Sequence, residues 1–525
     1  MNNNTIKILA PLFFGATLML GIFMGRSLNQ NRQNDASHLN GQKFQDILDV
    51  LDKQYVDTLN KEDLFEATIN EMLHKLDPHS NYIAAKDLLA MKESIDGEFG
   101  GIGVRFAIIR DTLNVTHVVP NSPSELAGLK KFDQIIAVND SSILNIRLTN
   151  TRVQELLKGK AGSPVKVTIY RNKSVINKEI IRGMVPIESV LAHHMVNQDI
   201  GYIRLSQFSI KSDQEFFEAA FKLKEDGMQK LILDLRYNGG GAMGSAVNIV
   251  DAFLEAGLKI VSTKGKNQPE EIVYSSNSDF LGNIEIVVLI NGNSASASEI
   301  VAGAIQDNDR GTIVGRRSFG KGLVQQDFNL KDGSNLRLTI SRYYTPTGRS
   351  IQRPYSGNYE DYVLEEYNRL ESGELYELDS SLFADSLKYV TPGGKAVYGG
   401  GGIMPDVFVP LDTSGITLSL RRIQYTSALS DFAFDFVKTH TQKYSNMVSF
   451  DKNFQITNEI KNEFINYLKS YQLTLSEQDL KACQKVLFQE IKAEIARQYW
   501  LEDGSLYIRN KTDKEVLKAI EVLGL

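Results

Sequence analysis

Three glycine- and serine-rich segments carry the residue types that could attack a carbonyl group. They read DLRYNGGG (234–241), NGNSASASE (291–299) and RRSFGKGLVQ (316–325). Ser296 lies where a predicted buried strand passes into a predicted helix, and a helix N-terminus offers free N–H groups to a developing oxyanion. A serine hydroxyl is a poor nucleophile unless a base removes its proton. The pattern therefore indicates nucleophilic catalysis, provided that a base lies nearby.

Lys321 is the candidate base, because none of the three segments contains a histidine. A lysine acts as a base only if its pKa is lowered, and burial does this by disfavouring the charged form. Gln325 lies four positions further on, and such positions share a face on a strand or a helix, so its side chain could hold the amine in place. Taken singly, each segment has a simpler interpretation as a polar helix cap, a surface lysine or a turn. The NGGG turn also lacks the G-x-x-x-x-G-K-[ST] order of a phosphate-binding loop.

Alternating strands and helices surround these segments. Strands are expected at 200–208, 230–238, 284–291 and 311–315, and helices at 212–226, at 242–256 and from 296 onward. The strands at 230–238 and 284–291 are nearly continuous apolar runs, which is typical of a sheet buried on both faces. The three segments follow strand ends, where such sheets place their ligands. The pattern predicts an α/β domain with a parallel or mixed sheet.

A smaller domain of short strands is expected between residues 97 and 183. Strands are predicted at 113–120, 133–140 and 164–171, with a helix at 150–158. The segment NSPSELAGLKKFDQIIAVND (121–140) resembles a PDZ domain of the protease-associated type. Such domains add a chain end as a strand and hold its carboxylate in a glycine-rich loop. The resemblance implies that this loop consists of Gly100, Gly101, Ile102 and Gly103. Phe132 stands where glycine is usual, which leaves that turn's geometry open.

The order and spacing of the three glycine- and serine-rich segments resemble those of the carboxy-terminal processing peptidases, or tail-specific proteases. As in that family, the lysine follows the serine by 25 positions and the glutamine follows the lysine by four. The match extends to LDPHSNY (76–82), YYTPTGRSIQ (343–352) and GGIMPDV (401–407). The resemblance implies that Ser296 is the nucleophile, Lys321 the general base and Gln325 its positioner. It also implies an oxyanion hole made by the backbone N–H groups of Ala297 and of either Gly240 or Gly241.

The resemblance also implies the fold class, a multidomain α/β and α+β chain in which a PDZ domain is inserted in a crotonase- or ClpP-like peptidase core. The expected parts are a signal anchor or signal peptide (1–26), a tether (27–40), an N-terminal helical region (41–95), the PDZ domain (96–184), the peptidase core (185–414) and a C-terminal helical region (415–525). Residues 354–390 are expected to form an acidic insertion in the core. Between 354 and 387 nine Asp and Glu residues accompany one basic residue, Arg369, which is typical of a solvated charged face.

The N-terminal segment predicts export. Residues 8–25 form an 18-residue run without a charge, close to the short limit of a membrane-spanning helix. Neither an A-x-A-like cleavage site nor a nearby cysteine follows, so we expect an uncleaved signal anchor, with a removed signal peptide as the alternative. Either interpretation places the rest of the chain in the cell envelope, on the periplasmic side of the inner membrane.

Composition excludes several other classes. The 525 residues carry a net charge of −6 and no basic block, so no affinity for nucleic acid is expected. A single cysteine allows no intrachain disulfide, and the seven histidines show no H-E-x-x-H spacing, so no metal or other cofactor is expected. The resemblance, together with the N-terminal segment, therefore implies an exported serine endopeptidase whose partners are proteins or peptides with free C-termini. The alternatives are an inactive PDZ adaptor at the membrane and a phosphate-binding enzyme built around NGGG. The oligomeric state stays open.

Overall fold

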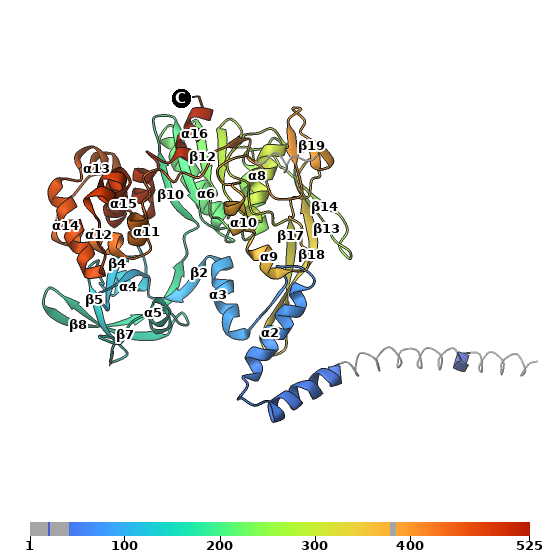
Figure 1. Ribbon diagram of the computed structural model, residues 1–525, viewed down its shortest axis with the longest axis horizontal. Helices are drawn as coiled ribbons and strands as arrows, with labels where there is room; N and C mark the ends of the chain where they lie inside the picture. The colour runs from blue at the N-terminus through green and yellow to red at the C-terminus, as the bar shows by residue number, and fades with distance from the viewer. Residues whose placement is uncertain (1–18, 22–40, 379–384, 441, 525) are drawn as a thin grey trace, which may run out of the picture. The chain divides into compact units, whose positions relative to one another are not determined.

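The computed structural model describes residues 19–21, 41–378, 385–440 and 442–524 (Figure 1). Apart from residues 19–21, the predicted signal anchor (8–25) and tether (27–40) lie outside the described residues. Within these ranges, no helix is both long and apolar enough to cross a membrane. The described residues form two compact units, which divide between Leu76 and Asp77.

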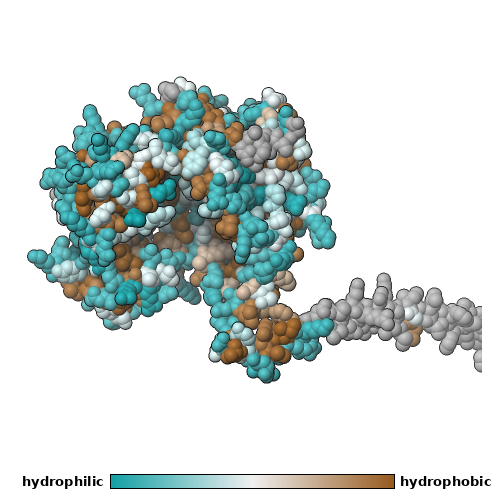
Figure 2. Space-filling model, in the orientation of Figure 1, coloured by the Kyte–Doolittle hydropathy of each residue, from teal (hydrophilic) through white to brown (hydrophobic). Residues whose placement is uncertain are grey.

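The described part of the first unit is helical, as its apolar spacing predicts. One helix covers residues 41–54, and α2 covers Lys61–His74. The Asn60 side chain caps α2 by accepting the N–H of Glu62 at 3.2 Å. Large apolar side chains are exposed on these helices, among them Ile47, Val50 and Met72. Figure 2 shows brown, hydrophobic patches over this segment.

A six-stranded sheet forms the centre of the second unit. Its order is β10 (Val190–Met195), β11 (Ile200–Leu205), β12 (Lys230–Asp234), β15 (Glu285–Ile290), β16 (Thr312–Gly315) and β21 (Val407–Phe408). Only the β10–β11 pair is antiparallel. The predicted strands are confirmed as β11, β12, β15 and β16, although β12 ends at Asp234, where the backbone enters a turn. Successive side chains of each strand enter opposite cores, which explains the continuous apolar runs.

Helices cover both faces of this sheet. Helices α6 (Ser212–Glu225), α7 (Met243–Asp251) and α8 (Ala297–Asp307) share the larger core with it. On the opposite face lies α16 (Lys514–Val522), whose Val516 and Ala519 are fully buried against Val287 and Leu289. Figure 1 shows α16 in red near the green strand β12. The last helix therefore completes the peptidase core, although the sequence placed it in a separate C-terminal region.

A second sheet borders the first. Its order is β1 (Asn81–Ile83), β18 (Asn335–Tyr344), β13 (Lys259–Lys264) and β14 (Glu271–Tyr274), and β17 (Leu323–Asn329) also pairs with β18. The sequence analysis predicted none of these strands. β1 lies in the expected N-terminal helical region but pairs with β18, with Asn81 opposite Arg337. It is followed by α3 (Ala85–Asp96).

A compact sheet lies between residues 104 and 181. It runs in the order β3 (Val104–Ile109), β4 (Thr112–Val118), β5 (Gln134–Val138), β7 (Pro164–Arg171) and β8 (Ser174–Ile181), and β6 (Ser141–Ser142) pairs with β5. Two short helices, α4 (Pro123–Leu126) and α5 (Asn150–Leu157), complete the domain. The strands predicted at 113–120, 133–140 and 164–171 and the helix at 150–158 are confirmed. β3 is an edge strand, because among the described strands it pairs only with β4.

A short ribbon made by β2 (Glu98–Gly101) and β9 (Gly183–Pro186) brings together the two ends of this domain. Phe132, which stands where glycine is usual, adopts a left-handed backbone conformation with φ 74°. Its ring lies 5.1 Å, between centroids, from the buried ring of Phe434 in the C-terminal region. A left-handed backbone is strained for a residue with a side chain. At Phe132 this conformation occurs together with the ring contact to the C-terminal region.

The C-terminal region is a helical bundle around an aromatic core. It contains α11 (Leu418–Gln424), α12 (Ala428–Thr439), α13 (Met447–Asn453), α14 (Asn458–Leu468) and α15 (Glu477–Arg509). Phe432, Phe450 and Phe464 are almost fully buried in it. α15 is kinked at Trp500 and Leu501, whose backbone angles are not helical.

Candidate active site

Ser296 lies at the junction between β15 and α8, as the sequence predicted. It is the residue before the helix and has φ 55° and ψ −113°, which is unusual for a residue with a side chain. The hydroxyl groups of Ser294 and Ser298 hold this turn, since each donates to a backbone carbonyl of the 235–238 segment at 2.8 Å. Strained residues of this kind persist only where surrounding contacts hold them, and they cluster at functional sites.

The NGGG turn lies directly against Ser296. A side chain at Gly240 would bring its Cβ within 2.7 Å of Ser296 Cβ, so only glycine fits there. The Gly240 N–H already donates to Asn238 Oδ1 at 2.9 Å. Gly241 and Phe208 form a parallel β-bridge, in which Phe208 hydrogen-bonds to the residues on either side of Gly241. The N–H of Gly241 itself therefore faces away from Phe208. Within the described chain, the N–H groups of Gly241 and Ala297 donate no hydrogen bond. These contacts favour Gly241 over Gly240 as an oxyanion donor.

Lys321 is held by the glutamine that its spacing singled out. Its Nζ donates to Gln325 Oε1 at 3.0 Å, and Gln325 Nε2 in turn donates to the backbone carbonyl of His79. Burial lowers the pKa of the Lys321 amine, and the nearby charge of Arg337 lowers it further, whereas Glu299 acts in the opposite direction. The environment therefore shifts the amine toward its neutral form, which is the form that can accept a proton.

Ser296 and Lys321 line the same cavity, which has a volume of about 510 Å³. Its walls also include Gly240, Gly241, Ala297, Gln325, Arg337, Tyr343 and three residues of α3, Met91, Ser94 and Ile95. In the described chain, no hydrogen bond joins Ser296 Oγ to Lys321 Nζ. The two side chains line the same cavity, and the Lys321 amine donates its hydrogen bond to Gln325.

A buried carboxylate connects the segments of Ser296 and Lys321. Glu299, which is 1% exposed, accepts the backbone N–H groups of Ser296 and Lys321 on Oε2, both at 2.8 Å. Its Oε1 accepts the N–H of Gly320 at 2.7 Å and the hydroxyl of Ser318 at 2.5 Å. Complete burial raises the pKa of Glu299, and these four donors act in the opposite direction. One side chain therefore fixes the backbone on both sides of the candidate site.

Comparison with known proteins shows to which family the chain belongs. The model of peptidase family S41 matches residues 199–363 and that of the PDZ domain matches residues 100–181. A carboxy-terminal-processing protease of Bartonella bacilliformis is 38% identical over 361 residues, which cover 67% of this chain and 81% of that protein. The chain belongs to the carboxy-terminal-processing proteases.

Other family models and proteins also match parts of the chain. A probable CtpA-like serine protease of Staphylococcus aureus is 31% identical to this protease over 338 residues, 64% of this chain and 67% of that protein. The N-terminal domain of the activating protease CtpB matches residues 23–87, and a family of unknown function matches residues 419–502. The solved structure of the photosystem II D1 C-terminal processing protease covers 70% of this chain and 92% of its own at 24% identity, with a TM-score of 0.35.

The predicted family and enzyme class are confirmed by these relatives: the protein is a serine-type peptidase and a hydrolase. The predicted fold class is confirmed too, since the protease combines a PDZ domain, an α/β peptidase core and a helical C-terminal region. Among the described residues, no group of three or more His, Cys, Asp or Glu side chains is placed to hold a metal ion.

The residues expected to form the PDZ carboxylate loop are divided between two elements of the protease. Gly100 and Gly101 end strand β2, whereas Ile102 and Gly103 make the turn into the edge strand β3. Gly103 has φ 79°, and a side chain there would bring its Cβ within 2.2 Å of Ser122 Cβ. Glycine is therefore required at Gly103 by both the backbone angle and the available space.

Sequence reasoning missed two functional contacts. The sequence pattern assigns no role in the site to Glu299, the last residue of NGNSASASE (291–299), although Ser-x-x-Glu before an apolar run is a known signal for a helix start. His79 was part of the LDPHSNY match, but no pattern could assign its carbonyl to Gln325. Its ring Nε2 lies 2.9 Å from the hydroxyl of Tyr362, and burial, with the Lys321 charge, lowers the pKa of His79 to about 3.

Proposed function

We propose that the protease cleaves polypeptides with a Ser–Lys dyad in which Ser296 is the nucleophile and Lys321 the general base. The observation that best supports this is that both side chains line one cavity in which burial lowers the pKa of Lys321. A general base has to be unprotonated at the working pH, and burial shifts the Lys321 amine toward that form. Gln325 positions the amine through its hydrogen bond.

The reaction would proceed in two stages. The neutral Lys321 amine accepts the hydroxyl proton while Ser296 Oγ bonds to the scissile carbonyl carbon, and the N–H groups of Ala297 and Gly241 receive the oxyanion. Lys321 then passes the proton to the leaving amine as the C–N bond breaks, leaving an ester on Ser296. A water molecule that gives its proton to Lys321 attacks this ester, and the proton returns to Ser296 as the acid product leaves.

Ser296→Ala tests the nucleophile. Cleavage of an internally quenched peptide with a free apolar C-terminus should disappear, while thermal unfolding stays unchanged. Ser276→Ala, on the exposed surface, is the matched control and should keep full activity. A serine-directed probe should label the wild type but not Ser296→Ala. Turnover by Ser296→Ala would reject the nucleophile, and a wild type that is neither labelled nor active would support an inactive PDZ adaptor instead.

We also propose that the PDZ domain captures the C-terminal tail of the substrate. Support comes from the free edge of β3 and from the turn at Ile102 and Gly103 that leads into it. An added strand would hydrogen-bond to this edge, and N–H groups of the turn would hold the terminal carboxylate. Peptides that differ only in C-terminal amidation test this by fluorescence anisotropy. The free acid should bind more tightly, and equal binding would reject tail recognition.

The proposed site of action is the cell envelope, and its support is the uncharged run at residues 8–25. Fractionation of cells that express the full chain, followed by N-terminal sequencing, would separate the two interpretations. An anchored chain keeps its first residues and needs detergent for release. A processed chain starts further along and is released with the periplasm, and cytoplasmic recovery would reject export.

A further inference from the structure

A lone basic side chain in the acidic segment 354–378 is buried rather than solvated. Arg369 lies on α10 (Glu365–Glu371), which follows α9 (Tyr359–Val363), and its side chain is only 4% exposed. A buried guanidinium is costly unless its donors are satisfied. The interpretation of this segment as a solvated charged face is therefore wrong for Arg369.

Arg369 binds the backbone of the loop that carries Lys321. Its Nη1 donates to the carbonyls of Ser318 at 2.9 Å and Arg317 at 3.3 Å, and its Nη2 donates to the carbonyl of Phe319 at 3.3 Å. A guanidinium presents five N–H donors in a rigid fork, so one side chain can gather three successive carbonyls. Its contacts end two residues before Lys321.

The opposite charge holds the remainder of the same loop. Glu299 accepts the N–H groups of Gly320 and Lys321 at 2.7 and 2.8 Å. The carbonyls of residues 317–319 thus meet a cation, and the N–H groups of residues 320 and 321 meet an anion. Each charge faces the matching end of the peptide dipoles, so both side chains favour the same loop conformation.

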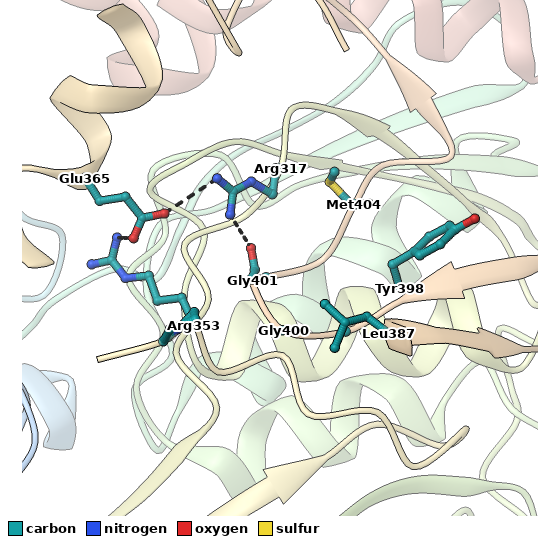
Figure 3. Close-up of a pocket in the computed structure, with 11 residues that line it drawn as sticks. Arg317, Arg353, Glu365, Leu387, Tyr398, Gly400, Gly401 and Met404 are labelled. Carbon is teal, nitrogen blue, oxygen red and sulfur yellow. Dashed lines mark hydrogen bonds and ion pairs between the residues drawn. The ribbon is translucent and has the colours of Figure 1, made fainter. Parts of the chain in front are cut away.

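Other ion pairs hold Arg369 in place. Glu365 Oε1 accepts from Arg369 Nε at 3.2 Å and from Arg369 Nη2 at 3.0 Å. Figure 3 shows Glu365 between the guanidinium groups of Arg317 and Arg353. The Arg353 guanidinium in turn lies 4.0 Å from the centroid of the Phe319 ring. The acidic segment therefore braces the loop through both backbone and side chains.

We propose that Arg369 is a positioning residue for the general base: it holds the 317–319 carbonyls so that Lys321 stays directed into the cavity beside Ser296. This inference rests on the proposed Ser–Lys dyad. Arg369 lies outside residues 199–363, the part of the chain that the peptidase family model matches. Its side chain acts through the loop and contacts neither Ser296 nor Lys321 in the described chain.

The pH dependence of cleavage reports the position of Lys321. The titratable and charged groups around its amine come from three other places in the fold and from the strand that follows it: Glu299 on α8, Arg337 on β18, Asp77 and His79 before β1, and Asp327 on β17. If the loop relaxes, water reaches the amine and its pKa returns toward the ordinary, higher value. The acid limb of kcat against pH then moves to higher pH.

Arg369→Met in the full chain is the direct test, with kcat and KM measured from pH 6 to 10 on the internally quenched peptide. At neutral pH kcat should fall at least about tenfold, because a misplacement of 1 Å can cost about a hundredfold. KM should change little, and part of the loss should be recovered at alkaline pH. Amide exchange of peptides covering residues 316–324 should become faster in the variant.

Arg310→Met is the matched control. Arg310 also donates to backbone carbonyls, those of Phe253, Leu281, Gly282 and Ile284, but not to the Lys321 loop. It should lower the melting temperature without moving the acid limb. A folded Arg369→Met with wild-type kcat would overturn the proposal. So would a profile that is uniformly lowered, with its acid limb in place, since that would indicate only a structural role.

Two further variants keep the test conclusive if Arg369→Met does not fold or if the proposed dyad is wrong. If Arg369→Met does not fold, Arg369→Lys is held to the same test, because lysine keeps the charge but lacks the planar fork. Ser296→Ala separates the two hypotheses. If Ser296→Ala still cleaves the peptide, the proposed dyad has failed. If it is inactive while Arg369→Met matches the wild type, only the role of Arg369 has failed.

Discussion

Glu299→Gln tests whether one buried carboxylate aligns the two halves of the active site. Glutamine has nearly the same shape but keeps only one of the two acceptor oxygens. Each oxygen of Glu299 accepts two donors, with Ser296 and Lys321 on Oε2 and Ser318 and Gly320 on Oε1. Whichever way the amide turns, two donors then face an NH₂ group.

The expected loss follows from these contacts. A hydrogen bond to a charged group contributes about 1.5–3 kcal/mol, so two lost bonds cost about 3–6 kcal/mol before any relief from removing a buried charge. If about 3 kcal/mol of this acts on the transition state, kcat/KM falls roughly a hundredfold. The remainder would appear as a lower free energy of unfolding, measured by urea titration.

The assay is kcat/KM on the internally quenched peptide, at a temperature well below the melting point of the variant. Glu494→Gln is the matched control, since Glu494 is also buried and accepts from Arg509 at 2.8 Å, but within α15. It should lower stability and leave kcat/KM unchanged. A folded Glu299→Gln with kcat/KM within about threefold of wild type, a difference below 1 kcal/mol, would refute the alignment argument.

Four further outcomes are expected. Lys321→Arg should be as inactive as Lys321→Ala in the peptide assay, because arginine keeps its proton near neutral pH; substantial turnover would contradict a dyad. Wild-type kcat/KM should rise with pH through the lowered pKa of Lys321, because the neutral amine is the active form; a profile that falls over this range would contradict that sign. Phe434→Ala should lower the free energy of unfolding in urea by about 3 kcal/mol, since a buried ring that contacts Phe132 is lost, whereas Phe328→Ala at the surface should cost little. EDTA should leave kcat/KM unchanged because the proposed base is an amine, and inhibition reversed by added metal would contradict this.

Local sequence patterns were sufficient for the elements that carry the chemistry. The apolar run of β15 and the helical spacing after it predicted the junction at Ser296. The spacing of four between Lys321 and Gln325 predicted their contact, although Lys321 precedes β17 rather than lying on it. Both features depend on residues that lie close together along the chain, and the junction at Ser296 follows from the periods of the strand and the helix on either side of it.

The partners of these elements depended on the tertiary structure. The His79 carbonyl that holds Gln325 comes from a distant segment before β1. The composition of residues 354–378 is acidic, but composition does not show which carboxylates are solvated. Glu374, for example, forms a largely buried ion pair with Arg317 at 2.6 Å. Strand and helix periods carry no information about contacts across long loops. Whether a charge is paired or hydrated depends on which segments pack against each other. The contact of Arg369 with the loop that carries Lys321 could therefore be found only in the folded chain.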